Sequence, residues 1–147
     1  MAEIDAKGNV NVSKFNGRVT GPGGFMDLTQ ATKKLIFMGT FTAGHLREHC
    51  ENGKLIIDHE GRYKKFKKTV EQITFSGTYA AARHQDVLVI TERAVFRLTP
   101  NGLMLTEVAP GIDIERDILA QMEFRPLMAA DIKTMDPRIF YPEAMGM

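Results

Sequence analysis

Cysteine is almost absent from this sequence, since Cys50 is the only one among 147 residues. A single cysteine cannot form a disulfide within the chain, so the fold must be stabilised by other means. The length suffices for this, because a chain of this size buries roughly two thirds of its surface on folding. A reduced thiol favours a cytoplasmic location, which we expect by default.

The sequence also lacks an excess of charge of either sign, because 19 basic and 18 acidic residues leave a formal net charge of +1. Such a balance gives no overall field that would hold the chain on nucleic acid or on an anionic membrane. The longest strongly apolar stretch, around Leu35–Met38, is far shorter than the ~20 residues of a membrane helix. Residues 1–9 contain no apolar run of signal-peptide length. We therefore expect no nucleic acid, no membrane and no export.

Short apolar segments predict a β-sheet. They are residues 10–15, 34–41, 54–57, 70–75, 87–90, 94–99 and 103–108. Because residues 34–41 form a continuous apolar run, we expect this strand in the middle of the sheet, covered on both faces. The last three segments are joined by short turns and predict neighbouring antiparallel strands.

Two segments are predicted to be helical, namely residues 25–32 and a helix that Asp113 caps and that runs to about Met122. The tail from Phe124 contains three prolines and predicts irregular structure. No repeat or linker divides the sequence, so residues 1–147 are expected to form one domain. Together the patterns predict a mixed α/β fold, a mixed sheet with helices on its faces.

His45 and His49 lie four residues apart with Glu48 before the second, as in the zinc-binding pattern H-x-x-E-H. That pattern requires a long helix and a third ligand on another element. Here Asn52-Gly53 would end a helix almost immediately. We therefore interpret the segment as a short amphipathic turn with exposed histidines, and we predict no metal site.

Residues 64–68 contain four lysines around Phe66, and Arg62 and Tyr63 precede them. A basic cluster with aromatic residues is compatible with a phosphate-bearing ligand or with nucleic acid. Charge runs are more often solvated faces, and acidic residues flank this one on both sides. We therefore predict an exposed, solvated surface.

Glycine is concentrated in one loop, at positions 17, 21, 23 and 24, with Pro22 among them. Glycine lets the backbone approach a ligand, and a helix that follows such a loop adds the positive end of its dipole. The loop could therefore present N–H groups to an anion or to a developing oxyanion. By itself the pattern more often describes a strained turn.

Several segments resemble the second half of family I coenzyme A transferases. They are residues 8–15, 21–28, 70–75, 91–96 and 105–111, in family order. Together they cover most of residues 2–140, which is more specific than any single motif. The likeness is to the single-chain acetate, propionate or short-chain acyl transferases. It implies the carboxyl-terminal portion of a NagB/RpiA/CoA-transferase-like domain.

In that family a glutamate carboxylate attacks an acyl-CoA, forms an anhydride and then a glutamyl-CoA thioester, and passes CoA to an acceptor carboxylate. The resemblance thus implies acyl-CoA and a short-chain carboxylate as substrates, with no permanently bound cofactor. It also implies that Gly21, Gly23 and Gly24 contact CoA or an oxyanion beside the thioester. The family's glutamate lies upstream of this loop, in a segment that would precede Met1, so we assign no catalytic residue.

Glu51-Asn52-Gly53 is similar to a motif that marks the nucleophile in some members, but it follows the glycine loop instead of preceding it, and we interpret it as a turn. Three hypotheses remain: a transferase fragment or subunit that needs a missing amino-terminal part; a non-catalytic, self-associating or CoA-binding module; and a different enzyme that uses Glu51 or the histidine pair. We favour the first. Without the missing part, apolar strands at 35–41 and 87–90 would be exposed and would favour a homo-oligomer.

Overall fold

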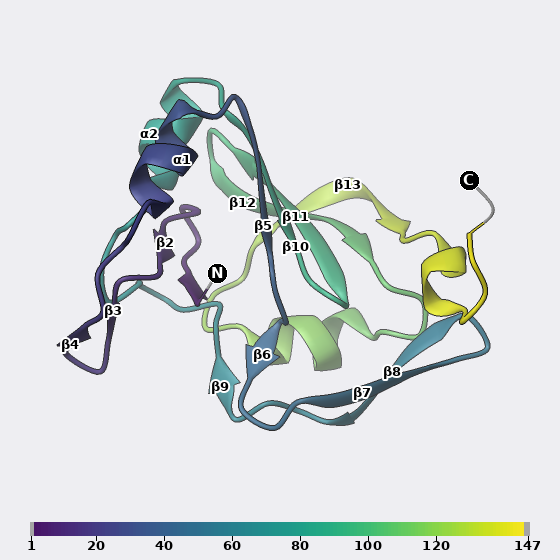
Figure 1. Cartoon of the computed structure of the whole chain (residues 1–147). Coiled ribbons are helices and arrows are strands. Elements are labelled where there is room, and N and C mark those ends of the chain that lie inside the picture. The colour runs from purple at the N-terminus through teal and green to yellow at the C-terminus, as the bar shows by residue number, and fades with distance from the viewer. Residues whose placement is uncertain (1, 146–147) are drawn as a thin grey trace.

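The computed structural model describes residues 2–145, and its central feature is a five-stranded sheet (Figure 1). The strands lie in the order β13 (Leu127–Thr134), β12 (Gly102–Val108), β11 (Ala94–Thr99), β10 (Asp86–Ile90) and β5 (Lys34–Met38). β10, β11 and β12 pair antiparallel as predicted, whereas β5 is parallel to β10 and β13 is parallel to β12. The predicted mixed α/β fold is therefore confirmed.

The two faces of the sheet carry separate apolar clusters, because side chains alternate along each strand. On one face, Val89 and Phe96 pack with residues of the helices α1 (Phe25–Ala31) and α2 (Gly77–Ala82). On the other face, Val95 packs with a smaller cluster that includes Leu55 and Phe140. The sheet therefore has its main core on one side and a partial cover on the other.

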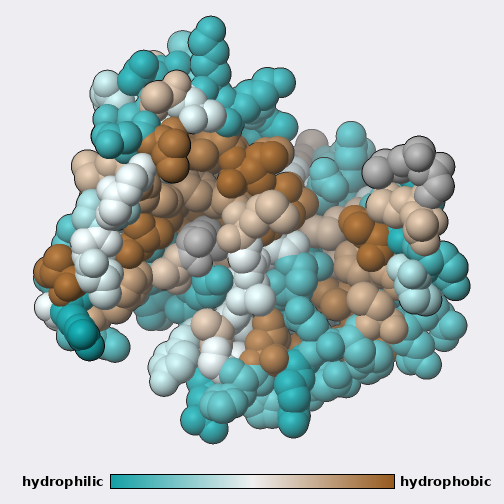
Figure 2. All heavy atoms as spheres, in the orientation of Figure 1, coloured by the Kyte–Doolittle hydropathy of each residue, from teal (hydrophilic) through white to brown (hydrophobic). Residues whose placement is uncertain are grey.

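The position of β5 differs from the prediction, because this strand lies at the edge of the described sheet. Only one face of it is buried: Phe37 is 5% exposed, whereas Ile36 and Met38 are 54% and 68% exposed. Figure 2 shows apolar surface gathered in this region beside α1. The prediction of a central strand was therefore wrong for residues 2–145, because a continuous apolar run does not reveal whether both faces of a strand are covered.

Helix α1 confirms the predicted helix after the glycine loop, whereas α2 was not predicted. Ser76 caps α2, since its hydroxyl accepts a hydrogen bond from the N–H of Tyr79 at 3.2 Å. The helix starts against the first residues of the chain. A Cβ at Gly77 would lie 2.1 Å from the carbonyl oxygen of Lys7, so only glycine fits this contact. Within residues 2–145 no helix is long and apolar enough to cross a membrane.

The segment after Asp113 is helical, but it is not the predicted α-helix. Asp113 caps it as expected, because its carboxylate accepts from the N–H of Arg116 at 2.8 Å. The backbone then winds as a π-helical turn, η1 (Ile114–Ile118), followed by a 3₁₀ turn, η2 (Leu119–Gln121). The apolar spacing was correctly interpreted, since Ile118 and Met122 are buried in the main core.

Four short antiparallel pairs complete the strands. They are β1 (Glu3–Ile4) with β2 (Val10–Asn11), β3 (Lys14–Phe15) with β4 (Arg18–Val19), β6 (Thr42–Ala43) with β9 (Tyr63–Lys64), and β7 (Arg47–Glu51) with β8 (Lys54–His59). The predicted strand 10–15 is broken because the Asn11 side chain accepts hydrogen bonds from the N–H groups of Ser13 and Lys14. The predicted strand 70–75 was wrong, since only Phe75 forms an isolated bridge, with Val10.

The tail from Phe124 is ordered into regular structure, contrary to the prediction. It forms β13 and the 3₁₀ turn η3 (Pro137–Phe140). The prolines do not interrupt these elements, because Pro126 precedes the strand and Pro137 begins the turn. Proline at such positions bounds an element and does not break it.

Candidate functional site

The glycine loop joins β4 to α1 and lies on the surface (Figure 1). Gly21 and Gly23 have φ angles of +81° and +54°, in the left-handed region that favours glycine. A Cβ placed on Gly21, Gly23 or Gly24 would meet nothing within 4 Å. Among residues 2–145, the N–H groups of Gly23 and Gly24 have no hydrogen-bond acceptor. The loop therefore offers open backbone donors to a ligand.

Buried polar contacts hold the start of this loop in place. The N–H groups of Thr20 and Gly21 donate to the carbonyl of Ser13 at 2.8 and 3.3 Å. Ser13 is itself fully buried, and its hydroxyl lies 2.7 Å from that of Thr74. The loop is thus tied to the segment 70–75, which is far away in sequence.

Aromatic packing holds the other end of the loop. Phe25, the first residue of α1, stacks on Phe37 of β5 with ring centroids 5.9 Å apart, and Phe37 packs edge-on against Phe75 at 5.1 Å. The Gln85 side chain also donates to the carbonyl of Thr29 at 2.7 Å. Both ends of the loop are therefore fixed to the core, while its backbone between them faces outward.

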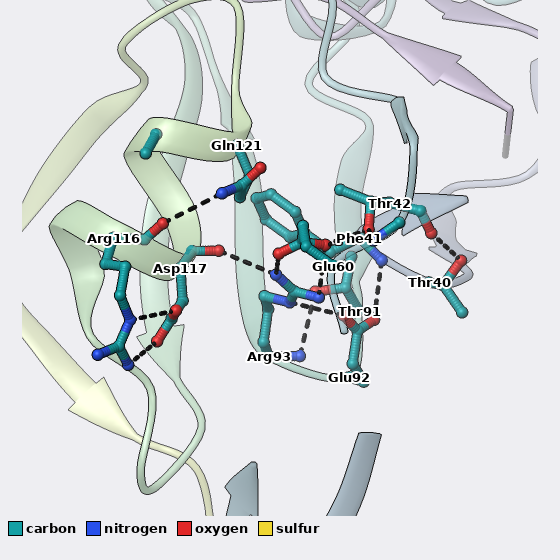
Figure 3. Close-up of polar contacts among 12 residues, drawn as sticks. Thr40, Phe41, Thr42, Glu60, Thr91, Glu92, Arg93, Arg116, Asp117 and Gln121 are labelled. Atoms are coloured by element: carbon teal, nitrogen blue, oxygen red, sulfur yellow. Dashed lines mark hydrogen bonds and ion pairs between the residues drawn. The ribbon is translucent and has the colours of Figure 1, made fainter. Parts of the chain in front are cut away.

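A second polar cluster surrounds Arg93, whose side chain is fully buried (Figure 3). Its guanidinium donates to Glu60 at 2.7 Å, to Glu92 at 2.7 Å and to the backbone carbonyl of Asp117 at 3.0 Å. It also lies over the ring of Phe41, 5.0 Å from the centroid. The cluster joins the turn between β10 and β11 to the β8–β9 connection and to η1.

Arg93 and Glu60 in this cluster both keep their charged forms. Burial alone would lower the pKa of Arg93, but its hydrogen bond to Glu60 and the charge of Glu92 raise that pKa above its ordinary value. Burial alone would raise the pKa of Glu60, but hydrogen bonds from Arg93 and Thr42 hold it below the usual range. Neither group is therefore suited to exchange a proton near neutral pH, and the arrangement suits a structural role.

The histidine pair is not on a turn or a helix. His45 lies in a loop with φ +68°, whereas His49 lies on strand β7, with its Nδ1 2.8 Å from a carboxylate oxygen of Asp58. Both histidines are exposed, as expected. In the described part of the chain, no group of three or more histidine, cysteine or acidic side chains could hold a metal ion.

Glu51 lies at the end of β7, beside the tight turn that leads into β8. The turn residues Asn52 and Gly53 have φ angles of +51° and +71°, as required in a two-residue hairpin turn. The interpretation of this motif as a turn is confirmed. The hairpin end lies on the side of the molecule opposite the glycine loop (Figure 1).

The basic cluster is only partly the solvated surface that was predicted. Lys65 and Phe66 are buried, at 8% and 0% exposure. The Lys65 ammonium group donates to the carbonyl of Thr40 at 2.6 Å, and burial lowers its pKa. Lys67 pairs with Glu123 at 2.6 Å. The segment therefore passes from the surface into the core at Lys65 and Phe66 and back to the surface, which charge alone could not indicate.

Curated relatives resemble the chain over almost its whole length. It is 52% identical over 146 residues to an acetate CoA-transferase, YdiF, of Escherichia coli K12, covering 99% of the chain and 28% of the relative. It is 50% identical over 152 residues to a caffeate CoA-transferase of Acetobacterium woodii, covering 29% of that protein. An acetate CoA-transferase subunit beta of Haemophilus influenzae is 33% identical and is covered to 50%. The chain thus spans under a third of the first two, and no family model matches it.

Solved structures of CoA-transferases are also similar to the chain. The acyl-CoA transferase YdiF of E. coli O157:H7, in its thioester complex with CoA, matches with a TM-score of 0.96 and 51% identity over 99% of the chain and 28% of that structure. Glutaconate CoA-transferase of Acidaminococcus fermentans matches with a TM-score of 0.64 at 20% identity, over 92% of the chain and 50% of that structure. The decarboxylase AibA/AibB has a similar score, 0.65, at 16% identity over 92% of the chain and 48% of that structure. At such identities the likeness shows the fold alone, and the same fold serves a decarboxylase.

Proposed function

Since the chain belongs to the family I coenzyme A transferases and corresponds to part of such an enzyme, we propose that it acts in the exchange of CoA between an acyl-CoA and a carboxylate. The proposed reaction passes through a covalent glutamyl-CoA thioester on the enzyme. CoA is therefore transferred to the acceptor carboxylate, and the acyl-CoA thioester is not lost to hydrolysis by water. The 52% identity over 146 residues, together with the matching backbone of the YdiF structure, is the observation that supports it most. Acyl-CoA and a short-chain carboxylate are the proposed substrates.

We propose that the glycine loop stabilises negative charge on the thioester carbonyl oxygen. Two adjacent N–H groups, of Gly23 and Gly24, have no acceptor within residues 2–145, and no side chain at these positions obstructs an approaching ligand. Preorganised donors of this kind stabilise an oxyanion without further reorganisation. The anchoring of both loop ends to the core supports this role, because it keeps the donors in one geometry.

The nucleophilic glutamate is proposed to come from the part of the enzyme that the chain does not span. Glu51, the residue here that resembles the family motif most, lies at a hairpin end far from the glycine loop (Figure 1). The proposed partner is therefore the remainder of the transferase. The exposed Ile36 and Met38 on the open edge strand β5 support this proposal, since they offer an apolar surface for that part. A cytoplasmic location remains a prediction from the lone cysteine.

The test is to mix the chain with the complementary segment of the transferase and to measure CoA exchange between acetyl-CoA and a short-chain acid. We expect exchange in the mixture. With Gly24→Val we expect the rate of exchange to fall by about tenfold or more relative to the unmodified chain. Gly24 has φ −79°, which valine tolerates, so the variant obstructs the loop without straining it. Ala31→Val, at the far end of α1, is the matched control. No exchange in a mixture of folded parts would reject the proposal.

The two other hypotheses give different outcomes in the same assay. A non-catalytic module would bind CoA or self-associate but would give no exchange with the complementary segment. An enzyme that uses Glu51 would turn over alone and would lose activity in Glu51→Gln. A covalent CoA adduct on the chain alone would likewise contradict the proposal.

A further inference from the structure

The β3–β4 hairpin, which leads into the glycine loop, buries little apolar surface. Each of its strands has only two residues, and residues 16–20 are all exposed. Phe15 is partly buried, whereas Val19 is 65% exposed. A two-stranded hairpin is at best marginally stable in water by itself. Its position must therefore be held by polar contacts with the rest of the chain.

One carboxylate binds the tip of this hairpin. The turn consists of Asn16 and Gly17, with φ angles of +52° and +76°. The N–H of Asn16 donates to one oxygen of Glu71 at 2.8 Å, and the N–H of Gly17 donates to the other at 2.7 Å. Hydrogen bonds to an ionised carboxylate are roughly twice as strong as neutral ones. Glu71, which lies 54 residues from Gly17 in sequence, thus holds both N–H groups of the turn.

Glu71 is itself held in place by its backbone and its neighbours. Its N–H donates to a carboxylate oxygen of Glu3 at 3.0 Å. Val70, the preceding residue, is only 6% exposed. Further along the segment, the N–H of Phe75 donates to the carbonyl of Val10 at 3.0 Å. The carboxylate is therefore presented from a segment that is anchored to the core on both sides.

The same segment also holds the base of the hairpin. Thr74, three residues after Glu71, has its hydroxyl 2.7 Å from that of Ser13 and accepts the N–H of Val12 at 3.2 Å. The carbonyl of Ser13 in turn accepts the N–H of Gly21, at 3.3 Å. Residues 70–75 thus fix the hairpin at two points, with Glu71 at the tip and Thr74 at the base.

We propose that Glu71 is a positioning residue for the proposed CoA exchange. By holding the Asn16-Gly17 turn, it determines the direction in which the glycine loop presents the open N–H groups of Gly23 and Gly24. This inference rests on the proposed function and adds to it a residue outside the loop. Donors stabilise an oxyanion most when they are already aimed at it. Loss of the Glu71 contact therefore lowers turnover more than it lowers the affinity for the substrate.

Kinetics of the chain mixed with the complementary segment test this inference. We expect Glu71→Ala to lower kcat about tenfold and to leave the KM for acyl-CoA within about twofold. Glu71→Gln keeps one acceptor oxygen for the two N–H groups, so its kcat should lie between those of Glu71→Ala and the unmodified chain. Lys14→Ala is the matched control, because it removes a cation 4.0 Å from Glu71 and leaves both hydrogen bonds of the turn. Its kcat should be unchanged.

A measurement on the chain alone does not depend on activity. Backbone ¹⁵N relaxation reports motion of the Gly23 and Gly24 amides on the picosecond to nanosecond timescale. We expect the heteronuclear NOE of both amides to fall in Glu71→Ala and to stay unchanged in Lys14→Ala. Thermal unfolding shows that each variant is folded at the temperature of the measurement. If Glu71→Ala does not fold, Glu71→Gln provides the same comparison.

The two measurements separate this inference from the proposed function. Restored exchange with an unchanged kcat in Glu71→Ala would overturn the positioning role and leave the proposed function in place. Equal NOE values in the Glu71 and Lys14 variants would also overturn it, since a merely structural role lowers the unfolding temperature without loosening the folded loop. Loss of exchange in every mixture, with Gly23 and Gly24 amides that still depend on Glu71, would reject the function and support the role of Glu71 in positioning the loop.

Discussion

Arg93 shows how a single residue joins distant parts of the chain. Its partners Glu60 and Asp117 are 33 and 24 residues away in sequence, yet both lie within hydrogen-bond distance of its guanidinium. A buried arginine is stabilising only while its partners remain, because the desolvation of each charge must be offset by the others. Removing one member would leave the remaining charges unpaired.

We predict that Arg93→Ala lowers the free energy of unfolding by about 3–5 kcal/mol, since it leaves Glu60 and Glu92 without their cation in a partly buried setting. The control is Arg97→Ala, which breaks an exposed pair with Asp86 and should cost under about 1 kcal/mol. Urea unfolding followed by circular dichroism measures both. Similar losses in the two variants would contradict the role assigned to Arg93.

For single residues, the sequence correctly predicted the features that are determined by adjacent residues in the chain, namely turns and loops. The turn at Asn52-Gly53 and the glycine loop were both located, because glycine and asparagine determine local backbone geometry. The Arg93 cluster was missed, because a contact across 33 residues leaves no local pattern. The one available signal was the charged pair Glu92-Arg93 between two apolar strands. The role proposed for Gly21, Gly23 and Gly24 came from family resemblance and stays a prediction.

Two wrong predictions about helices and strands, for β5 and for the tail from Phe124, have the same cause. Strand β5 was expected to be central and the tail from Phe124 irregular, yet β5 is at an edge and the tail forms the other edge strand, β13. Strand order depends on which segments meet in space, and apolar runs do not encode this. The helix after Asp113 was located correctly, but its π and 3₁₀ winding depends on tertiary packing.

The β7–β8 hairpin is predicted to depend on the glycine in its turn. Gly53 has φ +71°, and a Cβ there would lie 2.4 Å from the ring of Tyr141. We expect Gly53→Ala to lower the free energy of unfolding by about 1–3 kcal/mol, from left-handed strain and from this contact. Gly17→Ala has the same strain, φ +76°, but meets nothing within 4 Å, so it should cost less. Thermal unfolding of both variants is the measurement, and a larger loss in Gly17→Ala would refute this account.

For the molecule as a whole, the open edge of the sheet predicts self-association. Exposed Ile36 and Met38 on β5 should bring copies together at high concentration, because burying them removes apolar surface from water. Sedimentation velocity over a concentration series should show this, and Ile36→Lys with Met38→Lys should suppress it. Ile139→Lys, which charges an equally exposed isoleucine on η3, should not. A clean monomer at every concentration would contradict the prediction.

Residues 63–66 pass from the surface into the core, which has a consequence for how the chain tolerates mutation. Tyr63 and Lys64 are exposed, whereas the next two residues, Lys65 and Phe66, are buried, and the Phe66 ring stacks on Phe41 at 4.4 Å. Four consecutive residues thus belong half to the surface and half to the interior. A change that loosens the aromatic packing of Phe66 would also displace the exposed residues before it, so a mutation in the core is felt at the surface of this segment.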